Sequence, residues 1–261
     1  MSRSNPTTAA NPATRFFEWA AEKGELSYWD KATEQRIAVK MPFAFMVLDE
    51  VSQVGGGREV GDKWESYWSN AVKDINTQII TVRNKQGIID SGLYKDTFKD
   101  KKGFHYIKGL YIAYHGDGGE LEIGFLKLKT TSLSAWFEFT KQHRDIYKGA
   151  FIIRGKSEPI QSKKSIYHVP VFGFKADISP ESHEQAVKLD LELQEYFKQY
   201  FANSPSAAVD GNGHGDEPTH TGAAAASASA FAPPRVAEVA DTRHDWDAVP
   251  EDLEDDGSIP F

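Results

Sequence analysis

Several residue types and segment types are missing from this chain. None of its 261 residues is cysteine, so neither disulfides nor thiol chemistry contributes, and a reducing compartment is compatible. No segment approaches the ~18 consecutive apolar residues of a membrane helix. Residues 1–14 are polar and rich in Ala, Pro and Thr, without the apolar stretch of a signal peptide. We therefore expect a soluble, cytoplasmic protein with no membrane partner.

Signatures of catalysis and of metal or phosphate sites are absent as well. The glycine-rich segment at residues 55–61 lacks the Lys-Ser/Thr pair of a phosphate loop, so we interpret it as a turn. The eight histidines are scattered, and no pair has metal-ligand spacing with carboxylate support. We expect no enzyme activity, cofactor or metal. A nuclease with a divalent-metal site built from scattered Asp and Glu is the enzymatic alternative.

The charge of the chain is divided unevenly along its length. The net charge is −8, but residues 203–261 contain twelve acidic and two basic residues, which leaves residues 1–202 at +2. Residues 127–175 contain ten bases and three acids, a net charge of +7. Such a segment attracts an anion, although surface lysines that merely solvate the domain are the alternative interpretation. An acidic tail tethered to a basic body would compete with nucleic acid for it.

Composition divides the chain into four segments. Residues 1–13 are predicted to be a flexible arm, and residues 14–202 have the length and apolar content of one globular domain. From residue 203 onward Ser, Ala, Gly, Pro and Asp dominate, which predicts a low-complexity linker over residues 203–240. Residues 241–261 form an acidic tail, expected to be disordered together with the linker.

The domain is predicted to be mainly β with three helices, at residues 15–23, 132–147 and 181–201. Strands are expected at residues 37–54, 77–83, 105–115, 120–129, 150–155 and 165–175. Residues 116–119, Gly-Asp-Gly-Gly, predict a hairpin turn. Strands, a hairpin, one helix and two further strands are the order of the OB-fold, a five-stranded barrel, here with an extra C-terminal helix. A different small mixed sheet is the alternative.

Aromatic residues alternate with bases along strands and loops of the domain. Single-stranded nucleic acid offers phosphates to Lys and Arg, and it offers unstacked bases to aromatic rings. Core packing is the alternative for each aromatic residue and a solvated surface is the alternative for each base. The candidate stacking residues are Trp64, Trp68, Tyr94, Phe98, Phe104 and Tyr106. The candidate phosphate-binding residues are Arg83, Lys85, Lys99, Lys101, Lys102, Lys127, Arg154, Lys156, Lys163 and Lys164.

The last eleven residues are a run of carboxylates followed by a short apolar end, Ile259-Pro260-Phe261. This peptide is too charged and too short to fold alone, so it is predicted to be bound by a partner. Phe261 would fill a pocket and Pro260 would limit the entropy lost on binding. Asp255, Asp256 and the terminal carboxylate would face a basic rim.

Acidic residues followed by Ile-Pro-Phe resemble the tail tip of single-stranded DNA-binding proteins. The whole layout of one domain, a low-complexity linker and an acidic tail resembles the members of this family from bacteriophages. The resemblance implies a monomer or homodimer in the host-cell cytoplasm that coats unwound DNA during replication, recombination and repair. It also implies that the tail recruits replication proteins. A chaperone that binds double-stranded DNA or RNA, with an autoinhibitory acidic tail, is the second class that stays open.

Overall fold

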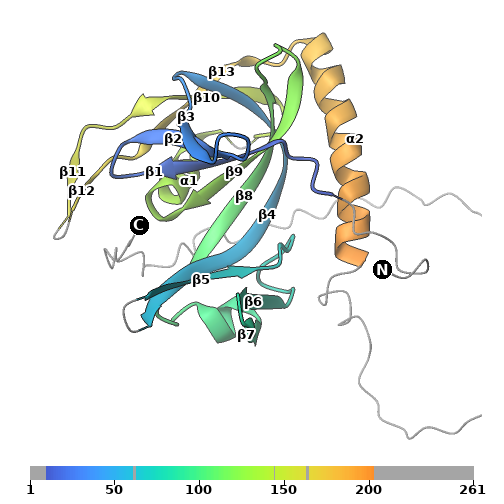
Figure 1. Ribbon diagram of the computed structural model, residues 1–261. Helices are drawn as coiled ribbons and strands as arrows, with labels where there is room; N and C mark the ends of the chain where they lie inside the picture. Colours follow the sequence, from blue (N-terminus) through green and yellow to red (C-terminus); the bar gives the residue numbers. More distant parts are fainter. Residues whose placement is uncertain (1–9, 61–62, 144, 163–164, 203–261) are drawn as a thin grey trace, which may run out of the picture. The chain divides into compact units, whose positions relative to one another are not determined.

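The computed structural model describes residues 10–60, 63–143, 145–162 and 165–202, all of which belong to one compact unit (Figure 1). These residues are mainly β-structure. The strands are β1 (Arg15–Ala20), β2 (Glu25–Asp30), β3 (Gln35–Ala38), β4 (Phe43–Val60), β5 (Lys63–Ser69), β6 (Ile80–Asn84), β7 (Gly87–Gly92), β8 (Phe104–His115), β9 (Leu121–Lys129), β10 (Gly149–Lys156), β11 (Ile160–Gln161), β12 (Ile166–Tyr167) and β13 (Pro170–Asp177). The helices are a π-helical turn η1 (Tyr94–Phe98), α1 (Thr130–Gln142) and α2 (Pro180–Ala202).

The described strands form one large open sheet and a separate ribbon of β11 and β12. The sheet order is β3-β2-β1-β9-β8-β4-β5-β6-β7, and β10 joins β4 and carries β13 on its other edge. The long strand β4 has three partners in succession: β10 near its start, β8 along its middle and β5 near its end (Figure 1). Among the described strands β13 pairs only with β10, so the sheet is not closed into a barrel.

The predicted helix at residues 15–23 is wrong, because this segment forms β1 and the turn that leads into β2. Its side chains alternate as a strand requires, with Phe17 and Trp19 buried and Phe16 exposed. In β1, Arg15 stands opposite Gly124 in a parallel ladder with β9. Both edges of β1 are paired, with β2 and with β9, and this pairing outweighs the helical spacing of its apolar residues.

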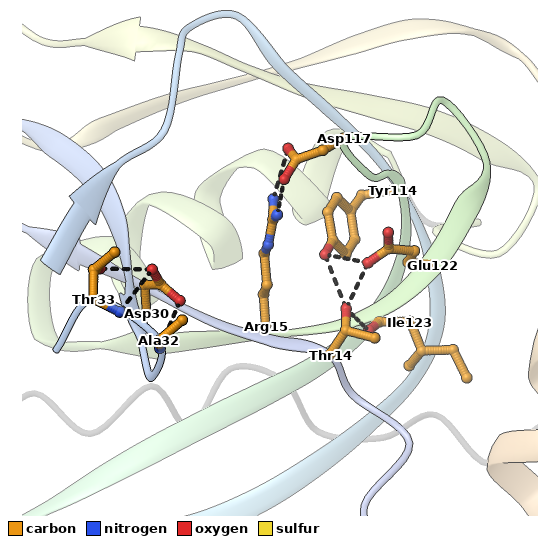
Figure 2. Close-up of polar contacts among 9 residues, drawn as sticks. All are labelled: Thr14, Arg15, Asp30, Ala32, Thr33, Tyr114, Asp117, Glu122 and Ile123. Atoms are coloured by element: carbon orange, nitrogen blue, oxygen red, sulfur yellow. Dashed lines mark hydrogen bonds and ion pairs between the residues drawn. The ribbon is translucent and has the colours of Figure 1, made fainter. Parts of the chain in front are cut away.

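Polar contacts fix the start of β1 (Figure 2). The Thr14 hydroxyl contacts the Tyr114 hydroxyl at 3.0 Å and donates to the Glu122 carboxylate at 2.8 Å, while Arg15 forms an ion pair with Asp117. Burial raises the pKa of Tyr114 to about 12, with the Thr14 hydrogen bond acting against the shift. Ala13 is also buried, so packing starts before the predicted boundary of the arm.

Residues 55–60 of the glycine-rich segment form the last part of β4 and not the predicted turn. The Gly57 amide donates to the Gly103 carbonyl at 3.0 Å, and Gly56 has φ of 140°. A Cβ atom on Gly56 would lie 2.1 Å from the Gly103 carbonyl oxygen. Glycine is needed here because another backbone segment crosses β4 closely.

Two predicted strands are interrupted: residues 37–54 divide between β3 and β4, and residues 165–175 divide between β12 and β13. The remaining predicted elements follow the predictions more closely. The hairpin of β8 and β9 is confirmed, with Gly119 at φ of 81° in its turn. Helices are present near both later predicted positions, as α1 and α2. No described helix is long and apolar enough to cross a membrane.

Alternation gives the sheet two faces. The inner face carries Phe17, Phe45 and Leu126, which pack around Trp136 of α1. The outer face carries Phe125, Lys127 and Lys129 of β9, and one end of it is covered by Leu193 and Phe197 of α2. A third cluster packs on the inner side of β4, β5 and β6; it comprises Val54, Tyr67, Val72, Ile80, Val82, Phe98 and Phe104. Phe174 of β13 is 39% exposed.

Candidate nucleic-acid interface

The end of the outer face that α2 leaves uncovered displays two tryptophans from β5. Trp64 and Trp68 are 38% and 47% exposed, while Tyr67 between them is buried on the inner side. The Trp64 indole lies over the backbone of Gly57, where an added Cβ would approach two ring atoms to 2.8 Å. The Trp64 ring can therefore lie against the sheet only because residue 57 has no side chain.

An arginine stands directly beside the second tryptophan. Trp68 and Arg83 are Cα partners across β5 and β6, so their side chains share the outer face. On the other side of Trp68, the register continues through Gly55 of β4 to His105 of β8. Arg83 and His105 are both exposed. One row across four strands thus combines an exposed indole with an arginine and a histidine.

A second group of bases lies on the same face, around Glu18 of β1. The Lys129 ammonium is 2.7 Å from a Glu18 carboxylate oxygen, and the Arg36 guanidinium is 3.4 Å from the other oxygen. Lys127, one of the predicted phosphate-binding residues, has its Nζ 3.9 Å from Glu18. Three cations therefore surround one anion, and the group carries an excess of two positive charges.

The pKa values in this group reflect that excess. Burial alone would raise the pKa of Glu18, but the charges of Lys129, Lys127 and Arg36 outweigh burial and lower it. The pKa of Lys127 is lowered by burial, with further repulsion from Lys129 and Arg36, and Glu18 offsets these effects only in part. The cluster would hold its charge more easily beside another anion.

Two exposed aromatic residues that the sequence analysis missed lie on the same face. Trp29 of β2 is 55% exposed and is the Cα partner of Arg36 in β3. Phe16 of β1 is 47% exposed and contacts the Phe125 ring at a centroid distance of 5.8 Å. Because residues 15–23 were predicted to be a helix, neither Phe16 nor Glu18 was assigned to a face of the sheet. Polar and apolar residues alternate through residues 25–28, which would have indicated a strand and placed Trp29 on its polar face.

The prediction that Phe98 and Phe104 form exposed stacking platforms is wrong. Phe98 is completely buried and Phe104 is 9% exposed, because both fill the third cluster. Tyr94 and Tyr106 are half-buried, with ring centroids 5.8 Å apart, and the Tyr106 hydroxyl contacts the Ser52 hydroxyl at 3.0 Å. The segment that contains these four aromatic residues therefore covers an apolar surface of the sheet.

The lysines of this segment are exposed. Lys99, Lys101 and Lys102 follow Phe98, which anchors the segment on the side opposite Trp68. Lys101 is also paired with Asp90 at 2.5 Å. Lys85 is exposed in the turn between β6 and β7, two residues after Arg83.

Two other predicted bases lie near the opposite end of β4. Arg154 and Lys156 are exposed on β10, which pairs with residues 43–46 of β4, whereas β5 pairs with residues 55–60. Nine residues of strand separate these regions by about 30 Å along β4. Arg154 and Lys156 therefore do not belong to the group around Trp68. Lys163 and Lys164 lie outside the described residues, and so do Asp255, Asp256, Ile259, Pro260 and Phe261.

No group of three or more His, Asp or Glu side chains among the described residues could hold a metal ion. Comparisons of the chain with protein-family models, with curated proteins and with solved structures found no match.

Proposed function

We propose that this protein binds single-stranded DNA, without sequence preference, across the uncovered end of the outer face. The observation that carries the proposal is the exposed pair of Trp68 and Arg83 in register on β5 and β6. Unpaired nucleobases stack on indole rings, at about 1–3 kcal/mol per nucleobase. Nearby lysine and arginine side chains neutralise the phosphates between them. Trp64 and Lys127 add a second ring and a further cation on the same face.

The strand pairing supports the OB-fold as the architecture behind this site. β4, β8 and β9 pair in succession, α1 follows β9, and β10 returns to β4 before pairing with β13. This is the strand and helix order of an OB barrel. The edge of β9 that would meet β13 in a closed barrel is paired in parallel with β1. We propose an OB-derived sheet that the strands β1, β2 and β3 extend.

The location of the site agrees with that architecture. OB-folds bind oligonucleotides on the face of their second and third strands and through the loops after the first and fourth strands. The second and third strands correspond to β8 and β9, which carry His105, Lys127 and Lys129. The connection after the first strand corresponds to the segment that contains β5 and β6, with Trp68 and Arg83.

The acidic tail completes the proposed function. Its tip, which ends in Phe261, would recruit replication proteins during replication and recombination of DNA, as in the bacteriophage family that the sequence resembles. The tail's ten net negative charges would compete with DNA for the basic face. Both roles rest on the sequence of residues 203–261, which lies outside the described residues.

Intrinsic tryptophan fluorescence tests the proposal. Oligo-dT should quench the emission, because Trp29, Trp64 and Trp68 are exposed on the outer face while Trp19 and Trp136 are buried. The same titration is made with duplex DNA and with RNA at equal salt. Tighter binding of duplex DNA or of RNA than of oligo-dT would instead indicate a chaperone that binds double-stranded DNA or RNA. Cleavage of labelled strands with magnesium or manganese would instead indicate a nuclease.

A further inference from the structure

The cluster formed by Glu18, Arg36, Lys127 and Lys129 has more hydrogen-bond donors than its one carboxylate uses. Lys129 alone is at hydrogen-bonding distance for a strong ion pair, 2.7 Å. Arg36 donates to Glu18 and to the Ser27 hydroxyl at 3.4 Å each, and Lys127 is at 3.9 Å. A guanidinium carries five N–H donors and each ammonium three. Most of this capacity faces the half-exposed outer face.

The cluster occupies a fixed place on three strands. Glu18 and Lys127 are Cα partners in the parallel ladder of β1 and β9, and Lys129 follows two residues later on the same face. Glu18 is also the partner of Ser27 in β2. The side chains of Arg36, Lys127 and Lys129 are 50%, 37% and 35% exposed, so a ligand can reach all three.

We propose that Arg36, Lys127 and Lys129 form a binding site for a phosphate group of the DNA backbone, and that Glu18 is the internal counter-ion that the phosphate replaces. This inference rests on the proposed function and adds a second contact region to it. Glu18 keeps three nearby cations together while the site holds no DNA. A backbone phosphodiester presents two non-bridging oxygens that share one negative charge, so it can take over the ion pairs that the two carboxylate oxygens of Glu18 make.

The neighbouring aromatic residues fit a nucleotide beside that phosphate. Trp29 lies next to Arg36. Phe16 lies on the outer face of β1, and its neighbour Phe17 points to the inner face. Three strand spacings and a two-residue offset along the strands separate Lys129 from Trp68 by about 16 Å, and Glu18 lies one strand farther away. A chain of about five stacked nucleotides spans that distance, at about 3.4 Å per nucleotide.

The test compares Glu18→Gln with the matched control Glu195→Gln, whose carboxylate is paired with Lys198 on α2. Glu18→Gln removes the competing charge, so the affinity for oligo-dT should rise about fivefold at low salt. The salt dependence should also steepen, because the cluster then brings a net charge of three to the DNA instead of two. Glu195→Gln should change neither quantity. Unchanged or weaker binding by a folded Glu18→Gln protein would overturn the inference.

Two further variants keep the test decisive if Glu18→Gln does not fold. Lys129→Ala and Arg36→Ala should each weaken binding about tenfold at low salt. At equal ionic strength, inorganic pyrophosphate should weaken oligo-dT binding by the wild type more than sodium chloride does. This difference between the two salts should be smaller for Lys129→Ala. That result distinguishes a phosphate site from general charge screening, and equal effects of the two salts would contradict it.

The outcomes separate this inference from the proposed function. If the wild type binds oligo-dT and Trp68→Ala weakens that binding, the proposed function stands. If Lys129→Ala and Arg36→Ala then bind like the wild type, only the phosphate site fails. If the wild type does not bind oligo-dT at all, the proposed function fails first.

Discussion

Trp68 and Arg83 stand opposite each other on neighbouring antiparallel strands, and both side chains are exposed on the outer face of the sheet. The same register places Tyr67 and Val82 on the inner side, where they are buried. Core packing therefore fixes the two strands, while the opposite face of the same strands is left to an aromatic ring and a cation. A ring beside a cation suits a nucleotide, which combines a flat base with a charged phosphate.

Removing the indole at position 68 should weaken DNA binding without unfolding the protein. Trp68→Ala should cost about 1–3 kcal/mol of binding free energy, because one base loses its stacking partner. Anisotropy of labelled oligo-dT measures the affinity, and thermal melting checks the fold. Phe174→Ala is the control, since Phe174 is similarly exposed but lies on β13. Equal losses for both variants would argue against a platform at Trp68.

Removing the charge at position 83 should change how binding depends on salt. Each phosphate contact to a single strand contributes about −0.7 to the slope of log affinity against log salt, so Arg83→Ala should make the slope shallower by about that amount. Titrations at several salt concentrations give the slope. Lys198→Ala, an exposed base of α2, should leave it unchanged. A wild-type slope in the Arg83→Ala protein would remove Arg83 from the interface.

Truncating Phe98 should destabilise the fold. The side chain is fully buried among Tyr67, Val82 and Phe104, so Phe98→Ala should lower the free energy of unfolding by about 3–5 kcal/mol. Urea unfolding followed by circular dichroism measures the loss. If the Phe98→Ala protein is stable but binds DNA more weakly, Phe98 would be a stacking residue and not a core residue.

Stability should fall at alkaline pH, in part through Tyr114. Its pKa is about 12 in the folded protein and about 10 unfolded, so the folded state holds the proton more tightly. The stabilisation is complete below pH ~10 and is lost as the pH rises towards ~12, by up to roughly 3 kcal/mol. Tyr114→Phe should make the decline in stability with pH less steep. Part of the decline should remain, because burial also raises the pKa of Tyr111. An identical decline in both proteins would contradict this assignment.

Deleting residues 203–261 should raise the affinity for oligo-dT at low salt, because it removes ten net negative charges from the chain. Binding to duplex DNA is also expected to increase. Replacing Phe261 alone should leave DNA binding intact and abolish capture of a replication protein in a pull-down. Unchanged low-salt affinity after the deletion would count against competition by the tail.

The sequence predicted the elements whose signals are local. The hairpin of β8 and β9 was indicated by its Gly-rich turn, and α2 by a long amphipathic repeat. The segment at residues 15–23 misled the prediction because Phe16, Trp19 and Ala20 fit helical spacing. Only the partners on both sides of β1, namely β2 and β9, make alternation decisive.

The candidate site was predictable in part, for a related reason. Trp64, Trp68 and Arg83 were identified from the alternation of aromatic and basic residues along the sequence, but their shared face follows from the register of β4, β5 and β6. Phe98 has the same neighbours in sequence as an exposed platform would have, and its burial depends on the distant Tyr67 and Val82. The Glu18 cluster joins residues of β1, β3 and β9, which no local pattern connects.

The central claim, that bases of single-stranded DNA stack on the outer face, is tested most directly by photo-crosslinking. An oligo-dT strand that carries 5-iododeoxyuridine is irradiated with the full-length protein, and the crosslinked residues are identified by mass spectrometry. Crosslinks to Trp68 and Trp64, with none to the buried Trp19 and Trp136, are the expected result. Crosslinks confined to residues 94–106 or to the hairpin of β11 and β12 would contradict it.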